Sequence, residues 1–262
     1  MKLFDSHCHL DDRSFQKDFD SVVGRAESVG VQKIMAVGTT GESSGQVVSI
    51  AEANENIYAS IGIHPHDAKD CSEEKLRLIR ALAKSMKVRA WGEIGLDFNR
   101  MHSPMADQEK WLIRQLEIAG ELELPVIFHE RDSDGRLLEI IKTLSKEPFG
   151  VVHCYSGNKA ELEQYLDLGL NIGITGILTL KERGGSLRDL VRFIPKNRLL
   201  IETDAPYLTP TPERNKFRRN EPAFVRSVLL KLAEVLDEDP ESLAEKTWDN
   251  TCRLFHIDNP SL

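Results

Sequence analysis

Residues 3–12 read LFDSHCHLDD, a short apolar start followed by a run of ionisable side chains. The start of this stretch is typical of a β-strand. Successive side chains of a strand point to opposite faces, so His7 and His9 share one face and Cys8 takes the other. Asp5 lies on the histidine face, one layer deeper. Three interpretations are open at this point: a metal site, a buried hydrogen-bonded cluster, or ordinary surface residues.

Further segments with the character of β-strands recur along the whole chain, and they alternate with helical segments. Strands are predicted at residues 2–9, 31–38, 57–65, 88–96, 124–130, 150–155, 170–176 and 198–204. Apolar residues three and four apart predict helices at residues 19–30, 43–54, 72–86, 107–123, 134–146, 159–169, 187–195, 221–237 and 240–255. Eight strands, each followed by a helix, predict a single (β/α)8 TIM-barrel domain over residues 1–262.

A doubly wound open sheet is the alternative arrangement of alternating strands and helices. Such a sheet needs a phosphate-binding glycine loop after an early strand. The segment GTTGESSG at residues 38–45 is a poor match to that loop. We therefore expect the barrel.

The composition is that of a soluble globular protein, with 40% hydrophobic and 29% charged residues. No apolar run is long enough to span a bilayer and no signal peptide is recognised, so we expect a cytoplasmic protein that does not bind membranes. The 4 cysteines form no CxxC pair, which indicates reduced thiols. A net charge of −8 gives no general attraction to nucleic acid, although a local basic segment or a bound cation can reverse the field at one site.

Side chains that bind metals stand at the carboxyl ends of several predicted strands. They are His7, His9, Glu93, His129, His153 and Asp204. In a parallel barrel these ends converge on one mouth, the face that carries catalysis. Imidazole favours Zn²⁺ and carboxylates admit Mg²⁺ and Mn²⁺, so the set suits one or two divalent cations.

Three further residues are candidates for supporting this site. Glu202 shares the face of Asp204 one layer down, and a carboxylate inside the barrel needs a partner. We expect Glu202 to accept the second N–H of a metal-binding histidine such as His7 or His9, or to bind an extra metal. Asp5 is expected to behave in the same way. His64 stands near the end of the third predicted strand.

The motifs as a set are those of a known family. They are DSHCHLD (5–11), GIHPHD (62–67), GEIGLDFNR (92–100), LPVIFHERD (124–132), VVHCYSG (151–157), IGITG (172–176), LLIETDAPYL (199–208) and RRNEPAF (218–224). With these motifs the chain resembles the TatD family of metal-dependent deoxyribonucleases, within the amidohydrolase superfamily. Related barrels that bridge two metals with a carbamylated lysine need Lys where this sequence has Glu93.

The resemblance implies a centre with two divalent ions, Mg²⁺, Mn²⁺ or Zn²⁺, and room for a third. His7, His9 and Asp204 would hold one ion together with Glu93. The second ion would be held by His129 and His153, with Glu93 bridging. His64 would face the substrate phosphate or the additional metal.

Two cations side by side can clamp a phosphate and activate water, which fits phosphodiester hydrolysis. Asp204 is then the expected general base or water-orienting group, beside Glu93. The family similarity implies a 3′→5′ DNA exonuclease or phosphodiesterase acting on single strands or 3′ ends, with no obligate protein partner. The alternatives are a D-aminoacyl-tRNA deacylase or another amidohydrolase or esterase at the same centre, and a non-enzymatic protein with structural metal.

Candidate contacts with substrate lie around the predicted mouth. They are His64, Arg100, Arg131, Tyr207, Arg218 and Arg219. The arginines offer positive charge to phosphate, and Tyr207 can stack on a terminal base; surface exposure and packing at the barrel rim are the competing interpretations. The segment RNKFRRN (214–220) is the densest basic stretch. Asn220 is predicted to cap the following helix, with Pro222 in its first turn.

Overall fold

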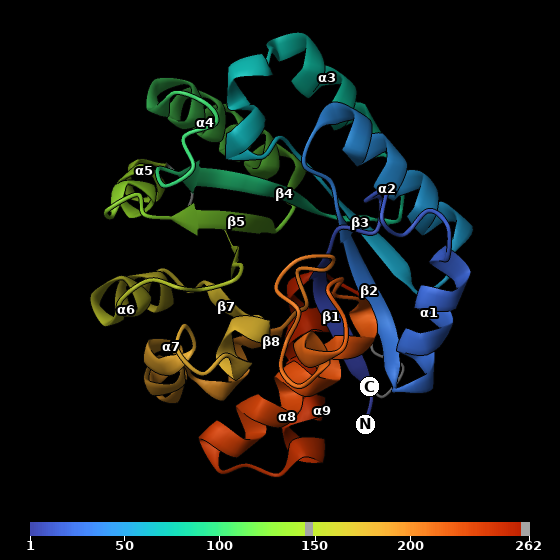
Figure 1. Ribbon diagram of the computed structural model, residues 1–262. Coiled ribbons are helices and arrows are strands. Elements are labelled where there is room, and N and C mark those ends of the chain that lie inside the picture. Colours follow the sequence, from blue (N-terminus) through green and yellow to red (C-terminus); the bar gives the residue numbers. More distant parts are fainter. Residues whose placement is uncertain (145–148, 258–262) are drawn as a thin grey trace. The chain divides into compact units, whose positions relative to one another are not determined.

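The computed structural model describes residues 1–144 and 149–257. Eight strands form one sheet in the order of the sequence, β1 to β8 (Figure 1). They are β1 (Leu3–Cys8), β2 (Val31–Val37), β3 (Ile57–Ile61), β4 (Val88–Asp97), β5 (Val126–Arg131), β6 (Gly150–Val152), β7 (Asn171–Ile174) and β8 (Leu199–Ile201). A doubly wound sheet reverses its strand order in the middle, so this order confirms the (β/α)8 class.

Helices alternate with the strands. They are α1 (Phe19–Ser28), α2 (Gly41–Ala53), α3 (Glu73–Leu82), α4 (Met105–Leu122), α5 (Arg136–Thr143), α6 (Lys159–Asp167), α7 (Gly185–Leu190), α8 (Val225–Leu236) and α9 (Pro240–Leu254). Short 3₁₀ turns are η1 (Pro65–Asp70), η2 (Gly176–Thr179), η3 (Val191–Phe193), η4 (Lys196–Arg198), η5 (Glu213–Asn215) and η6 (Pro222–Phe224). Residues 145 and 146 of one predicted helix lie outside the described residues. No helix in the described ranges combines the length and apolarity that a membrane crossing requires.

The chain divides into two compact units, each with its own buried core. The first comprises Met1–Ala36 and the chain from Ile172 onward, and the second comprises Val37–Asn171. In the first unit Phe4 packs against Trp248, with ring centroids 6.0 Å apart. In the second unit the largest fully buried side chain is Trp91. That the chain is one domain stays a prediction.

In the first unit, β1 and the segment after β8 are joined by hydrogen bonds. The Asp5 carboxylate accepts from the Thr203 backbone N–H at 2.8 Å and from the Thr203 hydroxyl at 2.6 Å. The backbone N–H of Asp204 donates to the carbonyl of His7 at 2.9 Å. These bonds fix the backbone that carries His7 next to the backbone that carries Asp204.

In the second unit, two glycines of β4 lie directly against the backbone of β5. The strand register shifts between Trp91 and Ile94, and Gly92 and Gly95 both have φ of 153°. A Cβ on Gly92 would stand 2.6 Å from the Ile127 carbonyl oxygen, and a Cβ on Gly95 would overlap the His129 backbone. Only glycine fits this close approach.

Several predicted strands are longer than the observed ones. Those that include His64, His153 and Asp204 end before these residues, which lie on the segments that follow β3, β6 and β8. The prediction that Glu93 ends its strand is also wrong, since β4 continues to Asp97. Residues 94–97 still pair with residues 128–131 of β5, which places Glu93 in the strand interior, and local sequence does not reveal this pairing.

The predicted cap at Asn220 is wrong as well. Glu221 is the residue before η6, and no side chain caps this turn. The Asn220 side chain is buried and donates instead to the carbonyls of Thr203 and Tyr207, at 2.9 and 2.6 Å. Asn220 therefore joins two parts of the segment after β8 by hydrogen bonds, a role that its position two residues before Pro222 did not reveal.

The close approach of β4 and β5 predicts a specific stability loss. We expect Gly95→Ala to lower the free energy of unfolding by at least about 2 kcal/mol, because the new methyl group meets backbone that has no room to move. Urea denaturation measures the change. The matched control is Gly45→Ala in α2, where a Cβ meets nothing within 4 Å. This control is expected to leave stability unchanged or to raise it by about 1 kcal/mol; equal stabilities for both variants would contradict the interpretation.

Candidate metal centre

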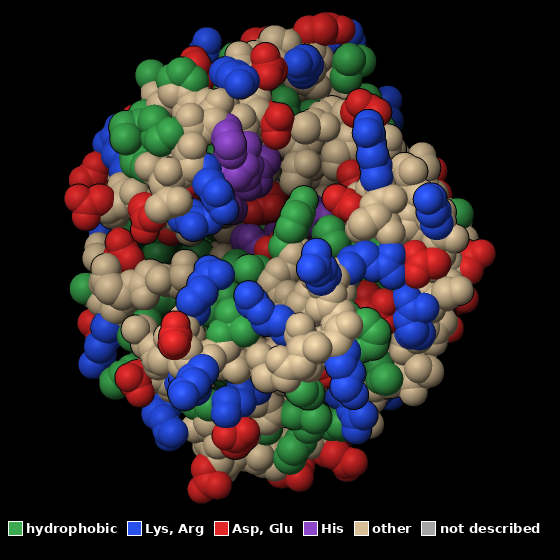
Figure 2. Space-filling view, in the orientation of Figure 1, with side chains coloured by type: hydrophobic (Ala, Val, Ile, Leu, Met, Phe, Trp, Pro, Cys, Tyr) green, Lys and Arg blue, Asp and Glu red, His purple; other side chains and the backbone are tan. Residues whose placement is uncertain are grey.

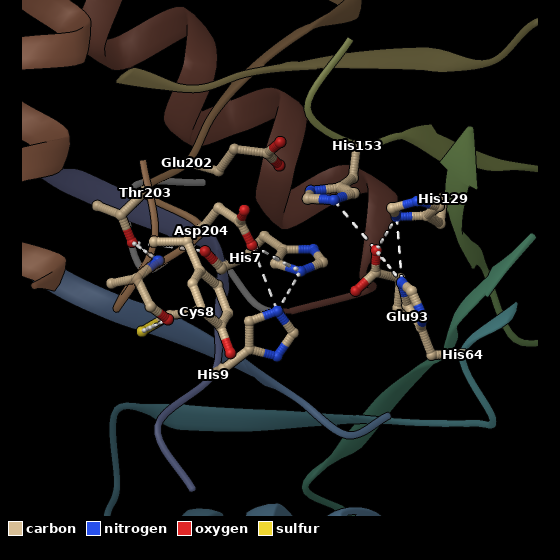
Figure 3. A network of polar contacts seen from close by, with 12 residues as sticks. His7, Cys8, His9, His64, Glu93, His129, His153, Glu202, Thr203 and Asp204 are labelled. Carbon is tan, nitrogen blue, oxygen red and sulfur yellow. Dashed lines mark hydrogen bonds and ion pairs between the residues drawn. The ribbon is translucent and has the colours of Figure 1, made fainter. Parts of the chain in front are cut away.

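In the first unit, His7, His9 and Asp204 form a group of converging ligand atoms (Figure 3). The two Nε2 atoms of His7 and His9 lie 3.3 Å apart. Asp204 Oδ1 is 3.3 Å from His9 Nε2 and 3.7 Å from His7 Nε2. His7 comes from β1, His9 from the turn after it, and Asp204 from the segment after β8. We call these three residues the first ligand group.

The residues around the first ligand group hold it in place. Burial raises the pKa of Asp5 to about 8, and Asp5 acts through its hydrogen bonds to the backbone of His7 and to Thr203. Glu202 is fully buried, accepts from the Ser6 hydroxyl at 3.2 Å, and has an oxygen within 4.8 Å of a His7 ring nitrogen. That Glu202 supports a ligand or binds an extra metal stays a prediction.

Cys8 is turned away from the first ligand group. Its Sγ lies 3.7 Å from the carbonyl oxygen of Ala205, and burial raises the pKa of the thiol. A buried thiol whose pKa is raised is a poor metal ligand, because the thiolate is the binding form. Alternation along β1 therefore separates Cys8 from the two histidines beside it.

In the second unit, one oxygen of Glu93 faces three imidazoles (Figure 3). Glu93 Oε1 lies 2.6 Å from His129 Nδ1, 3.1 Å from His153 Nε2 and 3.5 Å from His64 Nε2. Glu93, His64 and His153 are buried, and His129 is partly exposed. We call these four residues the second ligand group.

The imidazoles of the second ligand group differ in their protonation. Burial lowers the pKa of His64 to about 4, which keeps its ring neutral near pH 7. Burial also acts to lower the pKa of His129, but hydrogen bonds with Asp97 and Glu93 outweigh it and raise the pKa above its ordinary value. Below that raised pKa, a cation that binds His129 has to displace a proton, so metal binding here weakens as the pH falls.

Both ligand groups fit a divalent metal ion. Each offers only imidazole nitrogens and carboxylate oxygens, the donors that suit Zn²⁺, Mn²⁺ and similar ions. Within the first group, and among Glu93, His129 and His153 of the second, these atoms lie within 4.8 Å of one another. The described residues thus include clusters of side chains that suit a divalent metal ion.

The motifs that supply these groups match one family over almost the whole chain. A family model described as TatD related DNase matches residues 4–256. The chain belongs to the TatD family. The similarity to TatD proteins thus covers both ligand groups and the strands that carry them.

Individual TatD proteins are similar over nearly their full length. The Rahnella sp. protein named 3′-5′ ssDNA/RNA exonuclease TatD is 42% identical, covering 97% of this chain and 98% of its own length. The Citrobacter koseri protein of the same name is also 42% identical, covering 97% and 99%. The crystal structure of YjjV, a TatD homologue of Escherichia coli K12, has 32% identity and a TM-score of 0.89, covering 98% of both chains.

Two residues of this TatD chain stand behind the second ligand group and were not predicted as site residues. Asp97 Oδ2 lies 2.6 Å from His66 Nε2 and 3.4 Å from His129 Nε2. The other Asp97 oxygen accepts the backbone N–H groups of Asn99 and Arg100. These bonds and those from both imidazoles outweigh burial and hold the pKa of Asp97 well below its usual range. Asp97 and His66 both lie inside the quoted motifs GEIGLD and GIHPHD, which was the available signal.

The structure places the predicted substrate contacts in different surroundings. Tyr207 is 55% exposed, and its ring meets the His9 ring edge to face with centroids 5.9 Å apart. Arg100 and Arg218 are exposed, and Arg131 at the end of β5 is half-buried. Their contacts with substrate stay predictions.

Arg219 has structural partners in the same unit. Its guanidinium donates to both carboxylate oxygens of Asp18 at 2.8 and 2.7 Å and to the Ser14 carbonyl, and it covers the Phe15 ring. The hydrogen bond from Arg219 is the main cause that lowers the pKa of Asp18 to about 2. A predicted role of Arg219 in binding phosphate competes with this ion pair.

The position of Asp97 predicts a change in metal affinity. We expect Asp97→Asn to weaken Mn²⁺ binding about 10- to 100-fold. An amide has one acceptor oxygen, so it cannot serve both the imidazoles and the backbone N–H groups of Asn99 and Arg100, and the orientation of His129 is lost. Isothermal titration calorimetry of the metal-stripped protein measures this. Asp70→Asn, at an exposed aspartate that ends η1, is the matched control. Identical Mn²⁺ affinities in the Asp97 variant and wild type would rule out the supporting role.

The Arg219–Asp18 pair predicts a titration shift. In Arg219→Ala the pKa of Asp18 should rise from about 2 toward its ordinary 3.8. A lowered carboxyl pKa stabilises the fold above the ordinary pKa and loses that effect as pH falls. The stability advantage of wild type over the variant should thus shrink between about pH 4 and pH 2, as NMR titration of Asp18 and acid denaturation would show. Arg218→Ala is the control and should leave the Asp18 titration unchanged.

Proposed function

We propose that this chain is a divalent-metal-dependent exonuclease that hydrolyses phosphodiester bonds of single-stranded DNA from the 3′ end. The main observation behind the proposal is that three imidazole nitrogens surround one oxygen of Glu93, in a chain of the TatD family. The printed name of its curated relatives, 3′-5′ ssDNA/RNA exonuclease, supports the substrate class and the polarity.

Each ligand group is proposed to hold one divalent cation. When bound, such cations supply electrostatic stabilisation of the phosphate and lower the pKa of a nearby water. His7 and His9 orient the first site through Nε2, and His129 and His153 orient the second through Nδ1 and Nε2. That Glu93 bridges two ions stays a prediction from the family resemblance.

Asp204 is proposed to take the proton of the attacking water. Its carboxylate belongs to the first ligand group and is partly exposed, so it can reach both a cation and solvent. The hydrogen bond from its backbone N–H to His7 holds this segment in place during the reaction. Glu93, which is buried, has no comparable access to water, and its proposed role is to hold metal.

The decisive experiment compares substrates after the metal is stripped and restored. We expect Mg²⁺ or Mn²⁺ to restore stepwise shortening from the 3′ end of a 5′-labelled single-stranded oligonucleotide. Blocking the 3′ end of the oligonucleotide should stop the reaction. The same preparation is tested on single-stranded RNA and on D-aminoacyl-tRNA, the substrate of the alternative deacylase. Cleavage of the tRNA ester with intact DNA under every metal would overturn the nuclease proposal.

Single substitutions separate the two ligand groups. His9→Ala and His153→Ala are each expected to lower bound metal by one ion per chain, measured by mass spectrometry of the loaded protein, and to reduce turnover at least about 100-fold. The control is His102→Ala, at an exposed histidine that lies outside both groups. Full metal content in both ligand variants would contradict the assignment of the two sites.

A further inference from the structure

The loop of residues 208–219, between β8 and η6, is fixed at several points along its length. The Thr209 hydroxyl donates to the Arg218 carbonyl at 3.1 Å, which closes the loop at its base. The Thr211 N–H donates to the Thr179 hydroxyl at 2.8 Å, and the Ser227 hydroxyl donates to Glu213 at 2.6 Å. A loop with these anchors holds its exposed side chains in defined positions.

The same loop is joined to the first ligand group within its unit. Asn220 donates to the carbonyls of Tyr207 and Thr203, one residue on either side of the Asp204–Pro206 segment. The Asn220 N–H donates to the Pro206 carbonyl at 3.1 Å. Tyr207 in turn meets His9 edge to face. A molecule that binds to the loop therefore lies at a fixed position relative to His9 and Asp204.

The outward side of the loop combines cations with an exposed aromatic ring. Arg214, Lys216 and Arg218 are exposed, and none of them has an ion pair with a residue in the described ranges. Phe217 is 51% exposed and is held by the Phe224 ring, with centroids 5.7 Å apart and planes tilted by 32°. On the face seen in Figure 2, Lys and Arg side chains lie among exposed hydrophobic ones. The partly buried Phe224 ring covers one side of Phe217, which leaves the other side of the Phe217 ring open to stack.

We propose that this loop is a second nucleotide subsite, where Phe217 stacks on a base upstream of the terminal nucleotide and Arg214, Lys216 and Arg218 bind the adjoining phosphates. The proposal rests on the proposed nuclease function and extends it to the part of the strand that is not cleaved. The whole chain has a net charge of −8, but three basic side chains give this loop a local positive charge that attracts a polyanion. Stacking needs an unpaired base, so the subsite favours single strands.

The experiment measures KM for a long and a short substrate, in one Phe variant and in a matched control. Phe217→Ala is compared with Phe193→Ala, because Phe193 in η3 is also 51% exposed in the same unit. For a single-stranded oligonucleotide of about ten nucleotides we expect Phe217→Ala to raise KM about tenfold with little change in kcat. KM for bis(p-nitrophenyl) phosphate, which cannot reach the loop, should stay unchanged, and Phe193→Ala should behave as wild type on both substrates. Phe217→Trp should restore the wild-type KM.

Charge and stacking are separated by salt. The double variant Lys216→Ala with Arg218→Ala is expected to flatten the dependence of log affinity on log salt concentration by about 1 to 1.5. Phe217→Ala should weaken binding and keep the wild-type slope. Equal KM values for the long oligonucleotide in Phe217→Ala and Phe193→Ala would overturn the subsite.

Direct binding distinguishes failure of the subsite from failure of the proposed function. Fluorescence anisotropy of a labelled single-stranded oligonucleotide needs no turnover, and Phe217→Ala should weaken this binding about tenfold. Weaker binding by Phe217→Ala in a protein that cleaves no nucleic acid would support the loop and refute the nuclease. Normal cleavage with unchanged binding would refute the loop alone. Wild-type binding of duplex as tight as that of single strand would contradict the stacking role of Phe217.

Discussion

The buried carboxylate of Glu93 is the constraint on which the second unit depends. An ionised carboxylate in a protein interior is costly unless it is paired, and here three imidazole nitrogens surround one of its oxygens. The glycines at 92 and 95 allow β4 to approach β5 closely enough for this arrangement. Asp97 lies on the far side of His129, with its Oδ2 3.4 Å from His129 Nε2.

The first unit buries a different carboxyl group, that of Asp5, and burial raises its pKa to about 8. Asp5 is fully buried and accepts hydrogen bonds from Thr203 and from the His7 backbone, which joins the start of the chain to the segment after β8. The candidate ligands His7 and Asp204 are carried by the two backbones that this carboxyl group connects. Stability and ligand position thus rest on the same few hydrogen bonds.

The proposed function depends on which candidate ligands and which basic side chains are accessible to water or to a substrate. Histidines and carboxylates gather in the two ligand groups, and Asp204 keeps access to water. Arg219 is committed to Asp18, whereas its neighbour Arg218 has no ion-pair partner among described residues. Adjacent arginines in one motif therefore have different roles, one inside the fold and one available to a ligand.

The sequence by itself determined the fold class and the identity of the candidate ligands. The spacing of apolar residues predicts strands and helices because it is a local property of the sequence. Eight alternations of strand and helix are compatible with few folds, and the observed strand order is that of a barrel. His7 and His9 could be separated from Cys8 by strand alternation alone, because the side-chain period of a strand is two. Short motifs were enough to indicate the family, because each motif contains its candidate site residue within a few positions.

Only the tertiary structure decided which residues are partners. Asp18 and Arg219 are 201 positions apart, and no local pattern links them. The interior position of Glu93 comes from the pairing of residues 94–97 with β5, and the role of Asp97 from its distance to His66 and His129. Hydrogen bonds and ion pairs form between atoms that are close in space, and sequence separation carries no information about that distance until the chain is folded.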